Sequence, residues 1–131
     1  MNKQTTFKAS LIVAALLAIP AAQAATMTKV DYNAAKERIS AEYKTDKTAC
    51  GSLAQNAKDV CMEEAKAKEK VAKAELEYGY TGKAADWTKV LTVKAETAYE
   101  VAKERCDDKA GNDKDICVKE AKAVETKALA D

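Results

Sequence analysis

Apolar side chains recur every three or four residues along most of this chain, which is the spacing that places them on one face of an α-helix. The pattern predicts helices over about 30–53 and 57–78, a third that Asp86 can cap, and a fourth over about 113–129. The four apolar stripes are Tyr32, Ala35, Ile39, Tyr43 and Cys50; Val60, Ala67, Val71, Ala74 and Tyr78; Trp87, Val90, Leu91, Ala95, Ala98, Val101 and Ala102; and Ile116, Ala121, Val124 and Ala128 or Leu129. We therefore expect an all-α fold of very high helix content.

The helical pattern is interrupted at Gly79-Tyr80-Thr81-Gly82, which contains two of the four glycines in the chain. This break divides the chain into one helical hairpin over 25–78, a linker over 79–85 and a second hairpin over 86–131. The two hairpins can fold together as a four-helix bundle or remain extended. Trp87 is expected to anchor the core at the start of the third helix.

The two hairpins resemble one another at an offset of 56 residues. The informative matches are Tyr43 with Tyr99, Cys50 with Cys106, Asn56 with Asn112, Asp59 with Asp115, and Cys61 with Cys117. Matches among alanine, lysine and glutamate carry little weight in so biased a composition. The pattern predicts an internal duplication of one hairpin, with Tyr43 and Tyr99 closing the core beneath each copy.

Each pair of cysteines brackets a turn signal. Gly111 suits the left-handed position beyond a helix end, and asparagine is a strong N-cap residue. The residues expected to cap the second helix of each hairpin are Asn56 and Asp59, and Asn112 and Asp115. The chain is therefore predicted to reverse direction midway between the two cysteines of each pair.

Two antiparallel helices that leave such a turn place residues equidistant from it at the same height, about five residues from the turn. This favours disulfides joining Cys50 to Cys61 and Cys106 to Cys117. If each pair instead lay on one continuous helix, the two sulfurs would be about 16 Å apart. The alternative pairing is then Cys50 with Cys117 and Cys61 with Cys106, but the helix-weak residues of the predicted turns disfavour it.

Residues 1–24 have the organisation of a secretory signal peptide. Two lysines precede the apolar run Ala9–Ile19, and Ala22-Gln23-Ala24 has the small-x-small pattern of a cleavage site. The apolar run of about eleven residues is shorter than the roughly twenty that span a bilayer, so no stable membrane anchor is expected after cleavage. We expect a periplasmic or secreted protein, where four cysteines can persist as disulfides.

The charge balance gives no basis for binding nucleic acid. The chain has 22 basic and 21 acidic residues; removal of the predicted signal peptide takes two lysines and no acid, leaving 20 and 21 and a net charge of −1. Cofactor and catalytic motifs are lacking: there is no histidine, no Cys-x-x-Cys and no phosphate-binding loop. We expect no enzyme activity and no cofactor.

The repeated segment Ala-Gly-Asn-Asp-Lys-Asp-Ile-Cys-Val-Lys-Glu-Ala-Lys-Ala, and its partner at 55–67, resembles small exported Ala/Lys/Glu-rich bacterial proteins of unknown function, which are often labelled TolA-like. The similarity to TolA itself, and to late-embryogenesis-abundant stress proteins, is one of composition. From the predicted export, the lack of catalytic motifs and the helical repeats, we expect a non-catalytic structural or protein-interaction role in the cell envelope, with an envelope protein as partner and an association with stress. The alternative is a cation- or metal-binding protein that uses the cysteine thiolates or the acidic pair Asp107-Asp108. The sequence leaves the oligomeric state open.

Overall fold

The computed structural model describes residues 27–130, and this part of the chain is helical with no strand. Its elements are α1 (Lys29–Cys50), α2 (Gln55–Thr81), α3 (Ala84–Arg105), the 3-10 turn η1 (Cys106–Asp108) and α4 (Gly111–Ala130). The all-α prediction is confirmed. The predicted signal peptide, residues 1–24 with cleavage after Ala24, lies outside the described residues.

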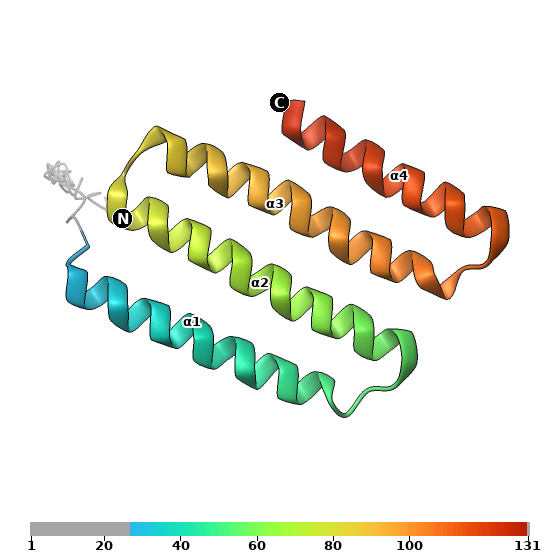
Figure 1. Cartoon of the computed structure of the whole chain (residues 1–131), viewed down its shortest axis with the longest axis horizontal. Coiled ribbons are helices and arrows are strands. Elements are labelled where there is room, and N and C mark those ends of the chain that lie inside the picture. The colour runs from blue at the N-terminus through green and yellow to red at the C-terminus, as the bar shows by residue number, and fades with distance from the viewer. Residues whose placement is uncertain (1–26, 131) are drawn as a thin grey trace, which may run out of the picture.

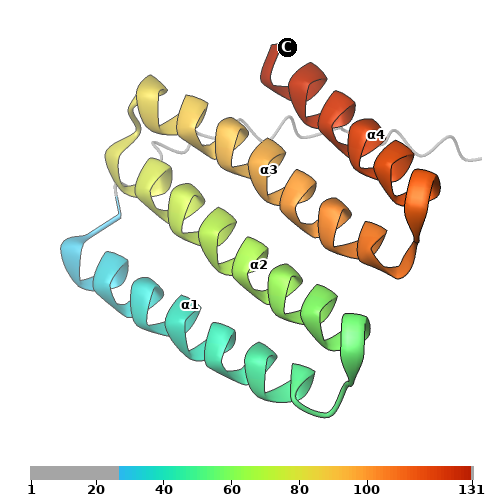
Figure 2. The ribbon, with the colours of Figure 1, turned by 45° about the vertical axis from the view of Figure 1, so that its right-hand side comes forward.

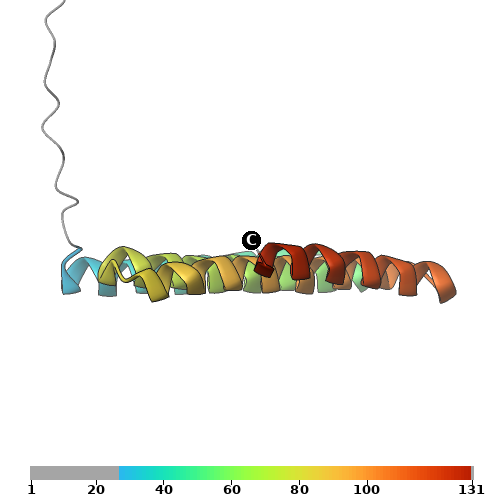
Figure 3. The same cartoon turned by 90° about the horizontal axis from the view of Figure 1, so that it is seen from above.

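The four helices lie side by side in a single layer. Each packs antiparallel to its neighbour in chain order, and α2 packs most extensively against α3 (Figures 1 and 2). Seen from above in Figure 3, the layer is one helix thick. The two hairpins pack together through α2 and α3, but they lie in one plane and do not form a four-helix bundle. Both faces of the layer are therefore open.

The ends of α1 and α2 follow from ordinary capping chemistry. The Thr28 hydroxyl accepts a hydrogen bond from the Asp31 backbone N–H at 3.1 Å and caps the start of α1. Helix α2 ends at Thr81 and is capped by Gly82, whose φ of 63° is left-handed and whose N–H donates to the Tyr78 carbonyl at 2.7 Å. Glycine is well suited to this position because it has no Cβ to clash.

The predicted linker over 79–85 is mostly helical, and only residues 82–83 lie between α2 and α3. A glycine inside a helix costs only about 1 kcal/mol, and contacts on the following turn can offset it. Here the Tyr80 ring packs against the ring of Tyr32 from α1, with centroids 4.6 Å apart. The last turn of α2 is therefore supported by a tertiary contact.

The prediction that Asp86 is the N-cap of the third helix is wrong. Lys83 has the extended backbone of an N-cap residue, and Asp86 lies in the first turn of α3. Its carboxylate accepts a hydrogen bond from the Thr81 hydroxyl. Asp86 therefore ties the end of α2 to the start of α3, and its charge also suits the positive helix terminus.

The disulfides join Cys50 to Cys61 and Cys106 to Cys117, with Cα–Cα distances of 5.6 and 5.7 Å. The pairing within each hairpin is therefore confirmed. Cys50 and Cys106 are almost fully buried, at 1% exposure each, where their helices meet the next ones. A disulfide that closes a loop this short adds about 3 kcal/mol to the free energy of unfolding, because it reduces the conformational entropy of the unfolded chain.

The turns differ from the predicted capping pattern. Gln55 and Gly111, 56 residues apart, have left-handed φ values of 53° and 56° and begin α2 and α4. Asn56 and Asn112 therefore lie inside the helices, and the N-cap residue of α2 is Ala54. The N-cap predictions for both asparagines are wrong, because the chain turns one residue earlier than expected.

The two predicted capping carboxylates are also misplaced. Asp59 and Asp115 are the fifth residues of α2 and α4. They therefore lie beyond the first turn, and it is the first turn that contains the free backbone N–H groups. In α4 the acidic residue of the first turn is Asp113. Within the described residues, the buried side-chain amide nitrogen of Asn56 has no hydrogen-bond partner.

Small residues make up much of the core. The buried apolar residues are Cys50, Ala65, Ala74, Leu76, Val90, Ala95 and Cys106. The prediction that Trp87 is a core anchor is wrong: it is 45% exposed and only leans on Tyr78, with ring centroids 5.2 Å apart. A single layer has no second layer to cover a large side chain on its face.

Candidate functional site

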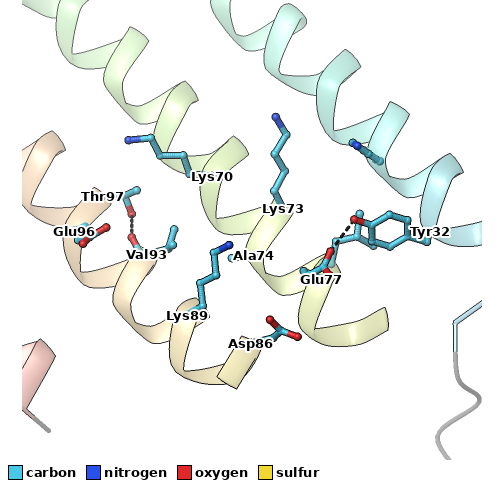
Figure 4. Close-up of a pocket in the computed structure, with 12 residues that line it drawn as sticks. Tyr32, Lys70, Lys73, Ala74, Glu77, Asp86, Lys89, Val93, Glu96 and Thr97 are labelled. Carbon is cyan, nitrogen blue, oxygen red and sulfur yellow. Dashed lines mark hydrogen bonds between the residues drawn. The ribbon is translucent and has the colours of Figure 1, made fainter. Parts of the chain in front are cut away.

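The largest hollow described in the structure is a trough that crosses the first three helices, shown in Figure 4. We call it the three-helix trough; its volume is about 540 Å³. Its lining residues are Tyr32 and Lys36 from α1; Lys70, Lys73, Ala74, Leu76 and Glu77 from α2; and Asp86, Lys89, Val93, Glu96 and Thr97 from α3. The rim is charged, whereas Ala74 and Leu76 in the lining are buried and apolar.

One end of the trough is fixed by a hydrogen bond between two helices. The Tyr32 hydroxyl donates to the Glu77 carboxylate at 2.7 Å, joining α1 to α2. This bond to a carboxylate raises the pKa of Tyr32 above its ordinary value of 10.0, and burial and the negative charge of Glu77 raise it further. Tyr32 therefore retains its proton and acts as a structural donor at neutral pH.

The lysines around the trough have different partners. Lys70 forms an ion pair with Glu100 at 2.8 Å, and Lys73 forms one with Glu69 at 2.6 Å. For Lys36 and Lys89, residues 27–130 contain no carboxylate within ion-pairing distance. Figure 4 shows Lys89 extending from α3 toward α2, whereas Lys73 extends from α2 on the side that faces α1. The trough thus offers ammonium groups from several helices over an apolar floor.

A second hollow lies between α3 and α4, on another part of the layer. This α3–α4 groove has a volume of about 130 Å³ and is lined mainly by alanines, together with Val124 and Glu125. Glu125 is 6% exposed and forms an ion pair with Lys122. The hydrogen bond to Glu125 raises the pKa of Lys122. Lys122 also lies over the Tyr99 ring, 4.8 Å from its centroid. The groove is the more apolar of the two hollows.

Five of the six predicted metal-binding candidates, the four cysteines and Asp107, are engaged in other interactions. All four cysteines are in disulfides, so they present no thiolate to a metal while oxidised. Asp107 at the second hairpin tip pairs with Lys114 at 2.9 Å. Within residues 27–130 there is no group of three or more cysteine or acidic side chains arranged to hold a metal ion.

No protein-family model, curated protein or solved structure gave a significant match when compared with this chain. The resemblance to exported Ala/Lys/Glu-rich proteins therefore stays a prediction. Of the helices in residues 27–130, none combines the length and the apolar character that crossing a membrane requires.

Neither hollow was anticipated from the sequence. The trough depends on α1, α2 and α3 lying in one plane, and no local motif specifies that arrangement. For the α3–α4 groove a usable signal was present: Ala95, Ala98 and Ala102 form a run of small residues on one side of α3. Small residues at helical spacing mark a place where a helix surface is shallow.

Proposed function

We propose that this protein is a non-catalytic, exported component of the cell envelope that acts by binding another envelope protein. The observation that carries the proposal is the three-helix trough, an open surface across α1, α2 and α3 with buried apolar residues in its lining and a charged rim. A small molecule would leave much of such a surface uncovered, because ligand pockets usually enclose most of their ligand. A polar segment of a protein could lie along it instead.

The disulfide framework supports the exported location. Two oxidised pairs are stable in the periplasm or outside the cell, and the first 24 residues have the sequence of a cleavable signal. The core is rich in alanine, which buries little apolar area and so contributes little hydrophobic stabilisation. The fold therefore depends on the two disulfides for stability. We also propose that the two hairpins arose by duplication, since the left-handed residues Gln55 and Gly111 occupy matched positions.

Site-specific photo-crosslinking in intact cells tests the proposal. A photoreactive amino acid at Lys89, inside the trough, should give a discrete adduct with one envelope protein. The same group at Thr45, on the exposed outer side of α1, is the control and should give none. The adduct should also be lost when Lys36→Glu and Lys73→Glu are introduced together. Equal crosslinking from Thr45, or an adduct that survives both charge reversals, would argue against the trough as the binding surface.

A further inference from the structure

The surface that remains unexplained is an apolar stripe along α3. It consists of Trp87, Leu91, Ala98 and Ala102, which fall within about 60° of one another around the helix at 100° per residue. Trp87 and Leu91 are 45% and 46% exposed, and Ala98 is also exposed. Lys89 and Glu96, which line the three-helix trough, lie on the opposite side of the same helix. The stripe and the trough therefore face away from each other.

The stripe has a two-fold pattern of large and small side chains. Measured from the midpoint between residues 94 and 95, Leu91 and Ala98 are equally distant, at about 5 Å, and Trp87 and Ala102 are equally distant, at about 11 Å. If a second α3 lies antiparallel on the first, each large residue meets a small one. Leu91 faces the partner's Ala98, and Trp87 faces the partner's Ala102. This is the alternation that allows two helix surfaces to interdigitate.

The α3–α4 groove provides the seat for the tryptophan. Ala98 and Ala102 form its α3 side, while Ala121 and Val124 form its α4 side, with Val124 68% exposed. Helix α4 does not extend alongside the first turns of α3, so Trp87 lies beyond the groove of its own chain (Figure 1). Reversal of the second copy places each Trp87 opposite Ala102 of the other, and the ring enters the groove by exchanging its contact with Tyr78 for the groove wall. The arrangement is reciprocal, as a two-fold interface requires.

Charge does not oppose this contact. Beside the midpoint of the stripe, Lys94 pairs with Glu75 at 2.6 Å, and near its far end Arg105 pairs with Glu64. The two-fold axis brings two neutral Lys94–Glu75 pairs together, so the contact does not oppose like charges at its centre. The net charge is +1 for the whole chain and −1 without residues 1–24, so two copies repel each other little.

We propose that two copies of this chain associate face to face through the α3 stripe, antiparallel, with Trp87 of each copy in the α3–α4 groove of the other. The contact converts two single layers into a two-layer structure and covers the exposed apolar residues of α3. It leaves the three-helix trough open on both outer surfaces. The inference is independent of the proposed partner of the trough.

Analytical ultracentrifugation tests the proposal on protein expressed from its full coding sequence and purified as the cell processes it. The wild-type chain should be a dimer that dissociates on dilution. Trp87 is the only tryptophan, so its emission should shift to longer wavelength over the same concentration range. A chain that stays monomeric at about millimolar concentration, where even weak specific dimers form, would overturn the proposal.

Four variants test the predicted register of the two helices. Ala98→Leu places leucine against leucine and should weaken dimerisation at least about 100-fold, and Leu91→Ala should weaken it by a similar factor because each dimer loses two leucine contacts. The double variant L91A/A98L exchanges large and small and should return to within about tenfold of wild type. Lys103→Leu adds leucine on the opposite side of α3 and should change nothing. Circular dichroism confirms that each variant is folded.

The remaining outcomes would contradict the inference. A dimer that tolerates Ala98→Leu, or a double variant that stays monomeric, would show that the two copies do not meet in this register. A blue shift of Trp87 emission caused by phosphatidylglycerol vesicles, with no shift on raising protein concentration, would show that the stripe binds lipid instead. The trough crosslink does not depend on any of these results.

Discussion

The two hairpin turns provide matched positions at which one substitution should have opposite effects. Gln55 and Gly111 both have left-handed backbone conformations, with φ of 53° and 56°. Glycine adopts this conformation readily, whereas a residue with a Cβ is strained there by about 1–2 kcal/mol. We therefore expect Gly111→Gln to destabilise the fold and Gln55→Gly to stabilise it.

The magnitude can be worked from the surroundings of Gly111. A Cβ at this position would have no heavy atom within 4 Å beyond its own neighbours in the chain, so backbone conformation alone determines the cost. For Gln55→Gly, the stability gained by removing backbone strain is partly offset, because glycine increases the conformational entropy of the unfolded chain. This offset is about 0.4–1 kcal/mol. The net change is about 1 kcal/mol in each direction, which corresponds to about 4 °C in Tm for a domain of this size.

Thermal and urea unfolding of the oxidised protein, followed by far-ultraviolet circular dichroism, measures both effects. Gln55→Gly should raise Tm and Gly111→Gln should lower it. The double variant, which only exchanges the two residues between turns, should unfold close to wild type, because distant substitutions are nearly additive. Equal shifts of the same sign for both single variants would refute the assignment of left-handed backbone strain to Gln55.

The other expected effects concern the disulfides, the core and the interhelical tyrosine. Replacing Cys106 and Cys117 together by alanine should cost about 3 kcal/mol in urea unfolding, and no loss would show that this disulfide does not stabilise the fold. Leu76→Ala should cost about 2–3 kcal/mol, because Leu76 is buried, whereas Val30→Ala, at 77% exposure, should change stability by less than about 0.5 kcal/mol; similar losses in both would contradict the location of the core. The pKa of Tyr32 is higher in the folded state than in the unfolded state. The stabilisation of the fold by its hydrogen bond is therefore complete below the unfolded-state pKa and is lost as pH rises through the folded-state pKa. A spectrophotometric titration of wild type minus Tyr32→Phe should show a midpoint above 10.0, and a midpoint at or below it would contradict the hydrogen bond to Glu77.

The sequence was sufficient to predict the helices and the disulfide pairing. Helical spacing identified the four elements, and the equal distances of Cys50 and Cys61 from a turn identified their partnership. Both depend on local geometry. The capping predictions failed because asparagine was assigned to the turn by its general preference, whereas the structure places Gln55 at the left-handed position and Ala54 at the N-cap.

The arrangement of the hairpins was not predictable, because it depends on contacts between residues distant in sequence. The stripe containing Trp87 indicated an apolar helix face but not what would cover it. In a bundle Trp87 and Leu91 would lie inside; in a single layer they are exposed, while Val90 and Ala95 of the same stripe are buried against the neighbouring helices. The trough follows from the same fact, since α1 and α3 flank α2 instead of folding over it.

A non-reduced peptide map, combined with the intact mass of protein recovered from the periplasm, tests the exported, twice cross-linked chain on which this account depends. We expect an N-terminus at Ala25, no free thiol, and two linked peptides joining Cys50 to Cys61 and Cys106 to Cys117. Four free thiols, a retained Met1, or a peptide joining Cys50 to Cys117 would contradict it.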